Sequence, residues 1–326
     1  MAFFSVLVPP TYKTPDRLDK YICDHTPNMN RSKLKSGLVT ILVNGKPQKI
    51  SYKVRPSDRI DVQWEENVPD NIDPEDIPLD IVYEDDNVCV VNKKQGMVTH
   101  PASGNWSGTL VNALLFHWNR QSIPELKTGS ASEILSNRRP GIVHRLDKDT
   151  SGLIITAKNR DTEEFLGNQF RNHNKIYKEY ICICMGRPQH SHGIIETQII
   201  RDPKDRKRFK AVVGTDEGKF ARSYYRCISC YGEYSLMRVR INTGRTHQIR
   251  VHMKYLNCPI LGDQIYSRPD RKFPGATLML HSRKMRIYIP GFRNKMEFVS
   301  PTPPRFVEVM KILKKDYPKT ILPDDR

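Results

Sequence analysis

Residues 144–152 read HRLDKDTSG and run directly into the apolar stretch LII at 153–155. This order of polar and apolar residues predicts a turn that leads into a buried strand, with Asp147 inside the turn. Burial at the edge of such a strand raises the pKa of a carboxyl group, and an arginine partner would hold it ionised. A solvated turn is the ordinary alternative for an aspartate, because few carboxylates are perturbed. Asp147 is our candidate for the residue that carries out chemistry.

The longer string HRLDKDTSGL resembles the signature of the RluA-type pseudouridine synthases, in which the aspartate of HRLD is the catalytic residue. The stretch KEYICICMG at 178–186 resembles the family strand K-x-Y-x-A-x-V-x-G, which makes Tyr180 the active-site tyrosine. NTGRTHQIRVH at 242–252 resembles the family's G-R-S/T-H-Q-I/L-R motif, which makes Arg245 the partner of the catalytic aspartate. One stretch departs from the pattern: residues 92–96 read NKKQG where the family commonly has NKPAG, so the shape of that loop is in question.

Each of these residues also has an ordinary structural interpretation. A tyrosine such as Tyr180 on a buried strand is usually part of the core. Arg245 could instead lie at the start of a helix near Thr246, where the helix dipole disfavours a cation and an anion such as Asp147 would offset it. Three histidines of the same half of the chain lack an acidic companion at metalloenzyme spacing and are expected to be structural: His247, His252 and His281. The short motifs LGD at 261–263 and LH at 280–281 complete the family pattern.

The cysteines and the absence of nucleotide motifs argue against a cofactor. Seven cysteines are present, an odd number without the density of a disulfide scaffold, which indicates a reducing compartment. A zinc site built from Cys182, Cys184, Cys227 and Cys230 is an alternative, but it contains only one C-x-x-C spacing, and Cys182 and Cys184 alternate with isoleucines as strand residues do. Neither GxGxxG nor GxxxxGK occurs. We therefore expect no cofactor and no metal.

The composition indicates a polyanionic partner. The 326 residues include 53 Lys and Arg against 36 Asp and Glu, a formal net charge of +17. Such an excess of cations binds nucleic acid by displacing counterions from its phosphates, and the lack of a basic amphipathic helix disfavours a membrane surface. No apolar run is long enough to cross a bilayer, and residues 1–8 lack the basic flank of a signal peptide. We expect a cytoplasmic monomer whose partner is structured RNA.

Residues 64–80 divide the chain. They contain seven acids, three prolines and no Lys or Arg, a composition typical of a linker. The sequence thus predicts an N-terminal domain at 1–63, an acidic linker at 64–80 and a catalytic domain at 81–326. In the first domain, RLDKYI, NRSKLKSGLV and VNGK resemble the S4 RNA-binding domain, which often precedes the catalytic domain in this family, and the Asn-Gly pair is a strong hairpin signal.

The larger domain is predicted to be α+β, with a mixed and largely antiparallel sheet. Strand-type stretches follow one another at 176–185, 193–200, 219–230 and 234–242 and return near 276–290, whereas helical spacing occurs at 110–118, 161–170, 246–257 and 304–315. Consecutive strands with helices between only some of them favour this class of fold over a parallel α/β arrangement.

Several cations are candidates for contacts with RNA, although a solvated basic surface is the default for any such run. Two groups and one further residue are proposed from the sequence: Arg31, Lys33 and Lys35 in the N-terminal domain, Lys204, Arg206, Lys207 and Arg208 in the stretch RDPKDRKRFK at 201–210, and Arg145 beside the candidate aspartate.

Together these features predict an RNA pseudouridine synthase in which Asp147 acts on a flipped-out uridine, Arg245 is its ion-pair partner, and Tyr180 stacks on the base or removes the C5 proton. The S4-bearing members of the family imply 23S ribosomal RNA as the substrate. Two alternatives stay open, a transfer-RNA synthase of the same family and a non-catalytic RNA-binding ribosome-assembly factor. The joint presence of all three residues favours catalysis, because binding alone would not require them. Sequence does not decide between a C1′ ester, a ring adduct and a glycal as the intermediate.

Overall fold

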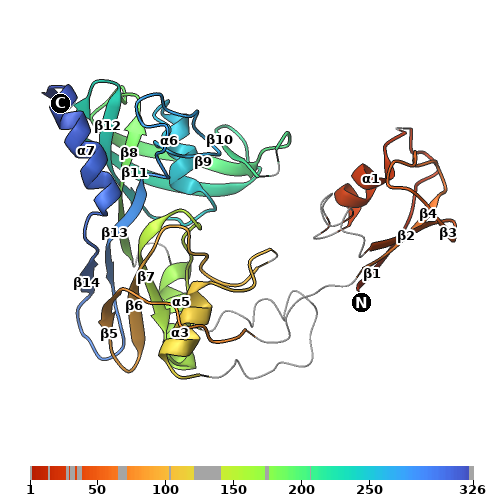
Figure 1. The fold of residues 1–326 in the computed structure, drawn as a ribbon, viewed down its shortest axis with the longest axis horizontal. Coiled ribbons are helices and arrows are strands. Elements are labelled where there is room, and N and C mark those ends of the chain that lie inside the picture. The colour runs from red at the N-terminus through yellow and green to blue at the C-terminus, as the bar shows by residue number, and fades with distance from the viewer. Residues whose placement is uncertain are drawn as a thin grey trace. The chain divides into compact units, whose positions relative to one another are not determined.

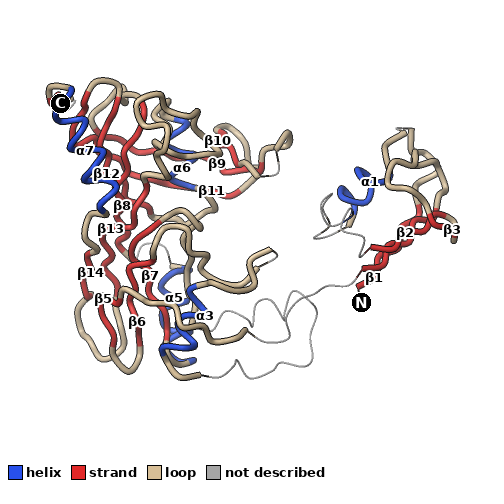
Figure 2. The backbone as a smooth tube through the Cα atoms, viewed as in Figure 1, coloured by secondary structure: helices blue, strands red, loops and turns tan. Residues whose placement is uncertain are grey.

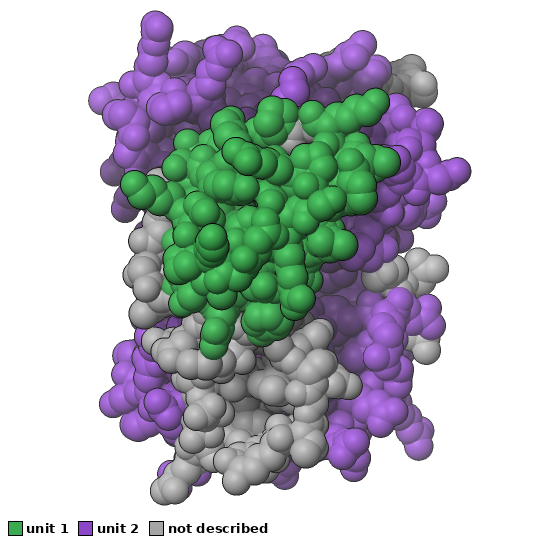
Figure 3. All heavy atoms as spheres, turned by 90° about the vertical axis from the view of Figure 1, so that its right-hand side faces the viewer, with its two compact units in different colours: residues 1–69 green, residues 70–326 purple. Residues whose placement is uncertain are grey.

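A computed structural model of the chain describes residues 2–13, 15–26, 29, 34, 39–64, 72–102, 104–120, 141–172, 176–205 and 207–322. The chain forms two compact units, residues 1–69 and 70–326, which are coloured separately in Figure 3. Four of the cations proposed for RNA binding lie outside the described residues: Arg31, Lys33, Lys35 and Arg206. No helix among the described residues is both long and apolar enough to cross a membrane.

The first unit is a small antiparallel sheet with one described helix. Its elements are β1 (Ala2–Leu7), α1 (Leu18–His25), β2 (Val39–Val43), β3 (Lys46–Pro47) and β4 (Arg59–Trp64), and the strand order is β1-β4-β2-β3. Asn44 and Gly45 both have positive φ, 52° and 75°, which is the type I′ geometry that their sequence predicts for the β2–β3 hairpin. Leu18 and Ile22 of α1 pack with Ile60 and Val62 of β4, so this unit has a core of its own.

The second unit is built on one eleven-stranded sheet, shown as arrows in Figure 1. Its main path is β10-β9-β11-β12-β8-β13-β7-β6-β5, with β14 beside β13 and β15 beside β11. The strands are β5 (Ile81–Glu84), β6 (Val88–Lys93), β7 (Ser151–Ala157), β8 (Tyr177–Met185), β9 (His192–Arg201), β10 (Phe209–Val212), β11 (Lys219–Tyr231), β12 (Tyr234–Ile241), β13 (Leu280–Ile287), β14 (Met296–Val299) and β15 (Lys319–Thr320).

Among the described strands of this sheet, β13 and β7 pair in parallel and the other neighbours are antiparallel. The helices are few and separated by long runs of strand, as Figure 2 shows: α3 (Leu110–His117), α5 (Arg160–Arg171), α6 (Gln248–Tyr255) and α7 (Pro304–Asp316). The predicted α+β class with a largely antiparallel sheet is therefore confirmed. Thr109 is the N-cap of α3, because its hydroxyl accepts from Asn112 N at the start of the helix.

The end of the predicted acidic linker is structured. Residues 65–71 lie outside the described residues, but Ile72 is buried against α3, and Asn112 Nδ2 donates to Asp73 O at 2.8 Å. Glu75 accepts from Gly108 N at 3.0 Å with both carboxylate oxygens. The chain from 72 onward thus packs on the second unit, because its acids find backbone donors there.

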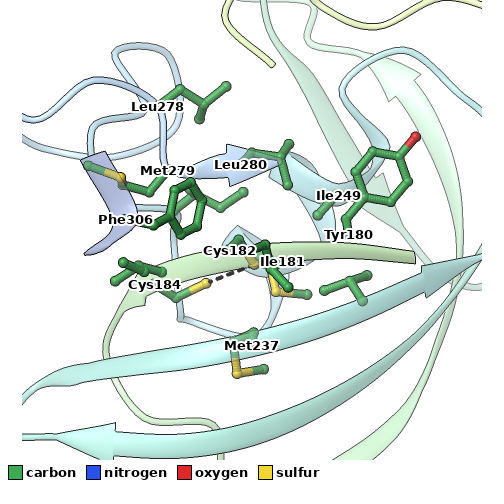
Figure 4. Close-up of a cluster of buried hydrophobic side chains, with 14 of the residues drawn as sticks. Tyr180, Ile181, Cys182, Cys184, Met237, Ile249, Leu278, Met279, Leu280 and Phe306 are labelled. Atoms are coloured by element: carbon green, nitrogen blue, oxygen red, sulfur yellow. Dashed lines mark hydrogen bonds between the residues drawn. The ribbon is translucent and has the colours of Figure 1, made fainter. Parts of the chain in front are cut away.

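The core of the second unit fixes the central strands. Figure 4 shows part of it: Cys182 of β8 is paired with Met237 of β12 on one side and Leu280 of β13 on the other, and Tyr180 lies at the edge with its hydroxyl pointing away from the cluster. Phe306, Val309 and Leu313 bring α7 onto this core. The strand that carries Tyr180 is therefore held rigidly along its length, which gives a firm base to any site at its end.

Candidate active site

A cavity of about 1470 Å³ opens where the loop 141–150, helix α5, strand β8 and the segment 244–250 meet. Asp147, Tyr180 and Arg245, the three residues predicted from the sequence, all line it, and Arg145 lines it too. The cavity wall is strongly basic, because it also includes Lys178 and other cations: Arg120, Lys158, Arg160, Arg171 and Arg250. The carboxylates of the lining are Asp147, Glu163 and Glu164, and the cations outnumber them, which suits an anionic substrate.

The loop that carries Asp147 is tied down by backbone contacts on both sides of the carboxylate. Thr99 Oγ1 donates to Leu146 O at 3.0 Å, and Gly96 N donates to Lys148 O at 2.9 Å. Thr150 N donates to Asp147 O at 3.1 Å and closes the turn. Asp147 itself remains 21% exposed at its side chain, so it is fixed in place and still reaches the cavity. Such preorganisation is what a reacting group needs.

Lys93, the last residue of β6, also contacts the loop that carries Asp147. Its ammonium is buried and donates to Met97 O at 2.8 Å, Lys94 O at 3.0 Å and Lys148 O at 3.2 Å. Burial lowers the pKa of Lys93 to about 7, although Asp147 and Asp149 oppose this. The lysine therefore joins the loop 94–97 to the loop of Asp147.

The departure from the family pattern at 92–96 adds contacts. Gln95 Nε2 donates to Asp149 O and to Leu278 O, both at 2.8 Å, and Gln95 Oε1 accepts from Thr277 Oγ1 at 2.7 Å. Gly96 takes a positive φ of 85°, which turns the backbone toward Lys148. The amide of Gln95 thus connects three segments around the site, which an alanine at this position could not do.

Arg250, in the first turn of α6, is the ion-pair partner of Asp147. Its Nη1 lies 3.2 Å from Asp147 Oδ2, while Nε and Nη2 donate to the two oxygens of Asp263 at 2.8 Å each. Asp263 also accepts from the backbone N–H groups of Ile265 and Tyr266 at 2.9 and 3.1 Å. Burial alone would lower the pKa of Arg250, but Asp263 and Asp147 outweigh it and raise the pKa above its usual value.

The predicted pairing of Arg245 with Asp147 was therefore wrong in its choice of arginine. Arg245 lies in the turn before α6, where its backbone N–H donates to Gln248 Oε1 at 3.0 Å and its Nε donates to Phe220 O at 2.9 Å. The argument that a cation at a helix start needs an anion still holds, but it applies to Arg250, whose charge is offset by Asp147 and Asp263. Arg245 stays in the cavity wall with a different set of contacts.

His247 lies near the same carboxylate oxygen of Asp147 that Arg250 contacts. Its Nε2 lies 3.9 Å from Asp147 Oδ2, and its Nδ1 is hydrogen-bonded to Tyr266 Oη at 2.8 Å. Burial lowers the pKa of His247, and Asp147 acts against this. His247 also takes a left-handed conformation with φ of 55°, which places the ring beside the aspartate at the N-terminus of α6.

Tyr180 projects from β8 into the cavity and is 7% exposed. Burial raises the pKa of Tyr180 to about 12, and the nearby charge of Asp147 adds to this, while a hydrogen bond with Ser282 acts in the opposite direction. The phenol is therefore neutral near pH 7. This favours the predicted stacking role over the role of a base, because a neutral phenol does not accept a proton readily.

Of the other cations predicted to contact RNA, Arg145 is exposed at the cavity, and Lys204, Lys207 and Arg208 lie in the β9–β10 hairpin. Arg208 Nε pairs with Asp205 Oδ2 at 3.4 Å. The base of the hairpin adjoins the site, because Phe209 packs edge-on against His247 at 5.6 Å between ring centroids and its N–H donates to Tyr266 Oη.

The cysteines and the remaining histidines have structural contacts. Cys182 and Cys184 Sγ atoms lie 3.6 Å apart, and those of Cys227 and Cys230 lie 3.5 Å apart, all within the core. Burial raises the pKa of Cys227 to about 12, so its thiol is protonated near neutral pH. In the part of the chain that the structure describes, no group of three or more His, Cys, Asp or Glu side chains could hold a metal ion.

Sequence reasoning missed Arg250 and Asp263 as functional residues, although both lie in stretches that it singled out, HQIR and LGD. It also missed Gln95, whose only signal was the departure from the family pattern, and Lys178. Lys178 could have been found from strand alternation, because it lies two residues before Tyr180 on β8 and so shares its face.

Comparison with known proteins places this geometry among RNA-modifying enzymes. Residues 87–255 match the family model of RNA pseudouridylate synthases. The ribosomal large subunit pseudouridine synthase D of Borreliella burgdorferi is 44% identical over 297 residues, which cover 89% of this chain and 87% of that protein. The protein of the same name from Pasteurella multocida is 35% identical and covers 92% of each chain.

Solved structures show the same fold. Human RNA pseudouridylate synthase domain containing 1 superposes with a TM-score of 0.57 at 22% identity, over 76% of this chain and 91% of that one. Human RNA pseudouridylate synthase domain containing 4 gives a TM-score of 0.52 at 24% identity, over 72% and 92% of the two chains.

Proposed function

The chain belongs to the RNA pseudouridylate synthase family, and we propose that it isomerises specific uridines of large-subunit ribosomal RNA with Asp147 as the nucleophile. The observation that carries this proposal is the placement of Asp147, held on a fixed loop at 3.2 Å from a buried arginine and open to a basic cavity. A carboxylate so held is oriented toward the cavity, which is what nucleophilic attack requires.

The reaction needs no net gain or loss of atoms. The N1–C1′ bond of the uridine breaks, the uracil turns within the cavity, C5 bonds to C1′, the C5 proton leaves, and N1 gains a proton. Asp147 provides the nucleophile for the first step and is released unchanged once the C5–C1′ bond has formed, and Arg250 orients its carboxylate. Tyr180 offers a flat, neutral ring on which the base stacks once the nucleotide is flipped out of the RNA.

The decisive variant is Asp147→Asn, which keeps the volume of the side chain but removes the anionic nucleophile. We expect it to form no pseudouridine while retaining RNA affinity and a wild-type unfolding transition. Product is measured by mass spectrometry of digested RNA, and affinity by fluorescence anisotropy. Asp149→Asn is the matched control, because Asp149 lies in the same turn and its carboxylate faces solvent. Turnover of the Asp147 variant near the wild-type rate would remove Asp147 from the mechanism.

The RNA target is proposed from the relatives, two of which are named for the ribosomal large subunit. Mapping pseudouridines in ribosomal and transfer RNA from cells with and without the gene tests this. Loss of modified positions in 23S RNA is the expected outcome. If pseudouridines disappear only from transfer RNA, the substrate is transfer RNA. If they disappear from neither RNA, a binding role without turnover is favoured.

The first unit is proposed to be an S4-like RNA-binding module of a cytoplasmic monomer. Support comes from its separate core, its helix and sheet, and the resemblance of its sequence motifs. Deleting residues 1–69 tests the division of labour. We expect weaker binding to structured RNA with a flatter salt dependence, by roughly 0.7 to 0.9 in the log–log slope for each phosphate that the shortened chain no longer neutralises. Loss of turnover at saturating RNA, with affinity unchanged, would mean that this unit completes the active site.

A further inference from the structure

One cation in the cavity has no counterion among the described residues. Lys178 of β8 is 6% exposed and lines the cavity, yet its ammonium makes no hydrogen bond or ion pair with any residue that the structure describes. Its Nζ instead lies 5.8 Å from the centroid of the Phe170 ring. A buried ammonium without a carboxylate is costly, so its presence at a cavity wall points to a ligand that completes it.

A second cation adjoins the first. Arg245 is close enough that its charge, after burial, helps to lower the pKa of Lys178 to about 8. The guanidinium of Arg245 donates through Nε to Phe220 O at 2.9 Å, its Nη atoms have no partner among the described residues, and the residue lines the cavity. Gly244, which precedes Arg245 in the chain, lies close to Lys178, because a Cβ added there would come within 3.8 Å of Lys178 Nζ. Two cations therefore repel each other across a small open space.

The position of this pair relative to Tyr180 suggests what it holds. Lys178 and Tyr180 project from the same face of β8, two residues apart, which corresponds to about 7 Å along the strand. If the base stacks on Tyr180 and its sugar lies at Asp147, the adjoining phosphodiester comes close enough to contact Lys178. The smaller hollow of about 330 Å³ next to the cavity is also lined by Arg171 and Arg245, so the positive surface continues outward along a path for the backbone.

We propose that Lys178 and Arg245 form an anion subsite that grips a phosphate of the RNA next to the flipped uridine. The inference deepens the proposed function and rests on it. Binding the phosphate relieves the repulsion between the two cations and gives Lys178 its missing counterion. Arg245 thus binds the RNA backbone, whereas Arg250 pairs with the carboxylate of Asp147.

The test is a cycle that combines a protein change with an RNA change. The substrate is a short RNA that the wild-type chain pseudouridylates, made with its native phosphates or with a neutral methylphosphonate on the 5′ or the 3′ side of the target uridine. Affinity and product are measured for wild type, Lys178→Met and Arg245→Gln, with Lys314→Gln on the exposed face of α7 as the matched control. Methionine keeps the apolar stem of Lys178 in place and removes only its charge.

For one of the two linkages, we expect the methylphosphonate to weaken wild-type binding by about tenfold and to have almost no further effect on Lys178→Met. Lys314→Gln should respond like wild type. The alternative outcome is that Lys178→Met and the methylphosphonate each lower the affinity by a factor that is independent of the other change, at both linkages. Lys178 then does not contact these phosphates, and the subsite is disproved. If wild type forms no pseudouridine in any RNA, the proposed function fails instead.

Stability separates this role from a structural one. A lysine retained for folding would destabilise the chain when replaced, but Lys178→Met removes a buried, unpaired charge. We expect its chemical-denaturation midpoint to be equal to or above that of wild type while its RNA affinity falls. A lowered midpoint together with unchanged affinity would identify Lys178 as a structural residue and overturn the proposal.

Discussion

Arg250 divides its guanidinium between two carboxylates: Nη1 reaches Asp147 at 3.2 Å, and Nε with Nη2 forms a two-bond contact with Asp263 at 2.8 Å. Asp263 is fully buried and fixed by two backbone N–H groups, so it positions the arginine that positions the aspartate. The orientation of Asp147 thus depends on a residue 116 positions away in sequence, as the numbers 147 and 263 show. Positioning of this kind carries a large share of a catalytic rate.

The first prediction follows from this contact. Arg250→Lys keeps a positive charge but cannot hold Asp263 with two parallel donors and reach Asp147 as well. We expect the single-turnover rate to fall by about 100-fold, as for other misplaced catalytic groups. Arg245→Lys, measured in parallel, should affect RNA affinity more than the saturated rate. The reverse order of effects would restore Arg245 as the partner of Asp147.

The same contact explains where sequence reasoning failed. Arg245 and Arg250 belong to one motif, and the choice between them depends on where helix α6 begins and on how the preceding turn is oriented. The structure begins the helix at Gln248, whose side chain accepts from Thr243 Oγ1 and Arg245 N and so fixes the turn. Arg250 then falls in the first helical turn and faces the cavity. Element boundaries are the least certain part of any sequence-based prediction, and here a shift of one turn changes the partner.

A second prediction concerns Tyr180. Because burial raises the pKa of its phenol to about 12, the ring is neutral and acts as an apolar platform near pH 7. Tyr180→Phe keeps this platform, and we expect RNA affinity to stay within about twofold of wild type. Tyr180→Ala removes it and should weaken binding by about 1 to 3 kcal/mol, the usual range for one stacked base. Equal losses for both variants in anisotropy titrations would show that the hydroxyl, not the ring, binds the RNA.

A third prediction concerns Gln95, which joins the loop of Asp147 to the segment before β13. Gln95→Ala removes the hydrogen bonds to Asp149 O and Leu278 O. We expect the saturated rate to fall between about 10- and 100-fold, because the loop loses a lateral support, with little change in RNA affinity. Lys94→Ala is the matched control, since its side chain is exposed in the same turn. A Gln95 variant that turned over as fast as this control would make the contact dispensable.

The fold itself followed well from sequence periodicity. The predicted strands at 193–200, 219–230 and 234–242 correspond to β9, β11 and β12, because each alternates buried and exposed residues along its length. Asp147 and Tyr180 could be placed in one site only through the family resemblance, since 33 positions separate them. Whether Lys178 would have an anionic partner could not be predicted from the sequence, because this depends on which charged groups the tertiary fold brings near it.

The last prediction is a pH dependence of RNA binding. The ordinary pKa of a lysine is about 10.5, and burial together with Arg245 lowers that of Lys178 to about 8. Below this value the free chain already carries the charge that a phosphate favours, and above it a proton must be taken up on binding. Affinity should therefore fall as the pH rises through 8, by at most about tenfold per pH unit.

The groups around Lys178 do not interfere in this window. Burial lowers the pKa of His144 to about 3, so it is neutral throughout. Lys178→Met should accordingly show a flat profile where wild type slopes. The free energy of unfolding changes with pH in the opposite direction to RNA affinity. The folded chain loses the Lys178 proton near pH 8, whereas the unfolded chain keeps it up to about pH 10.5, so wild-type stability should rise relative to Lys178→Met between pH 8 and 10.5. Parallel binding profiles for the two proteins would exclude Lys178 as the group that titrates.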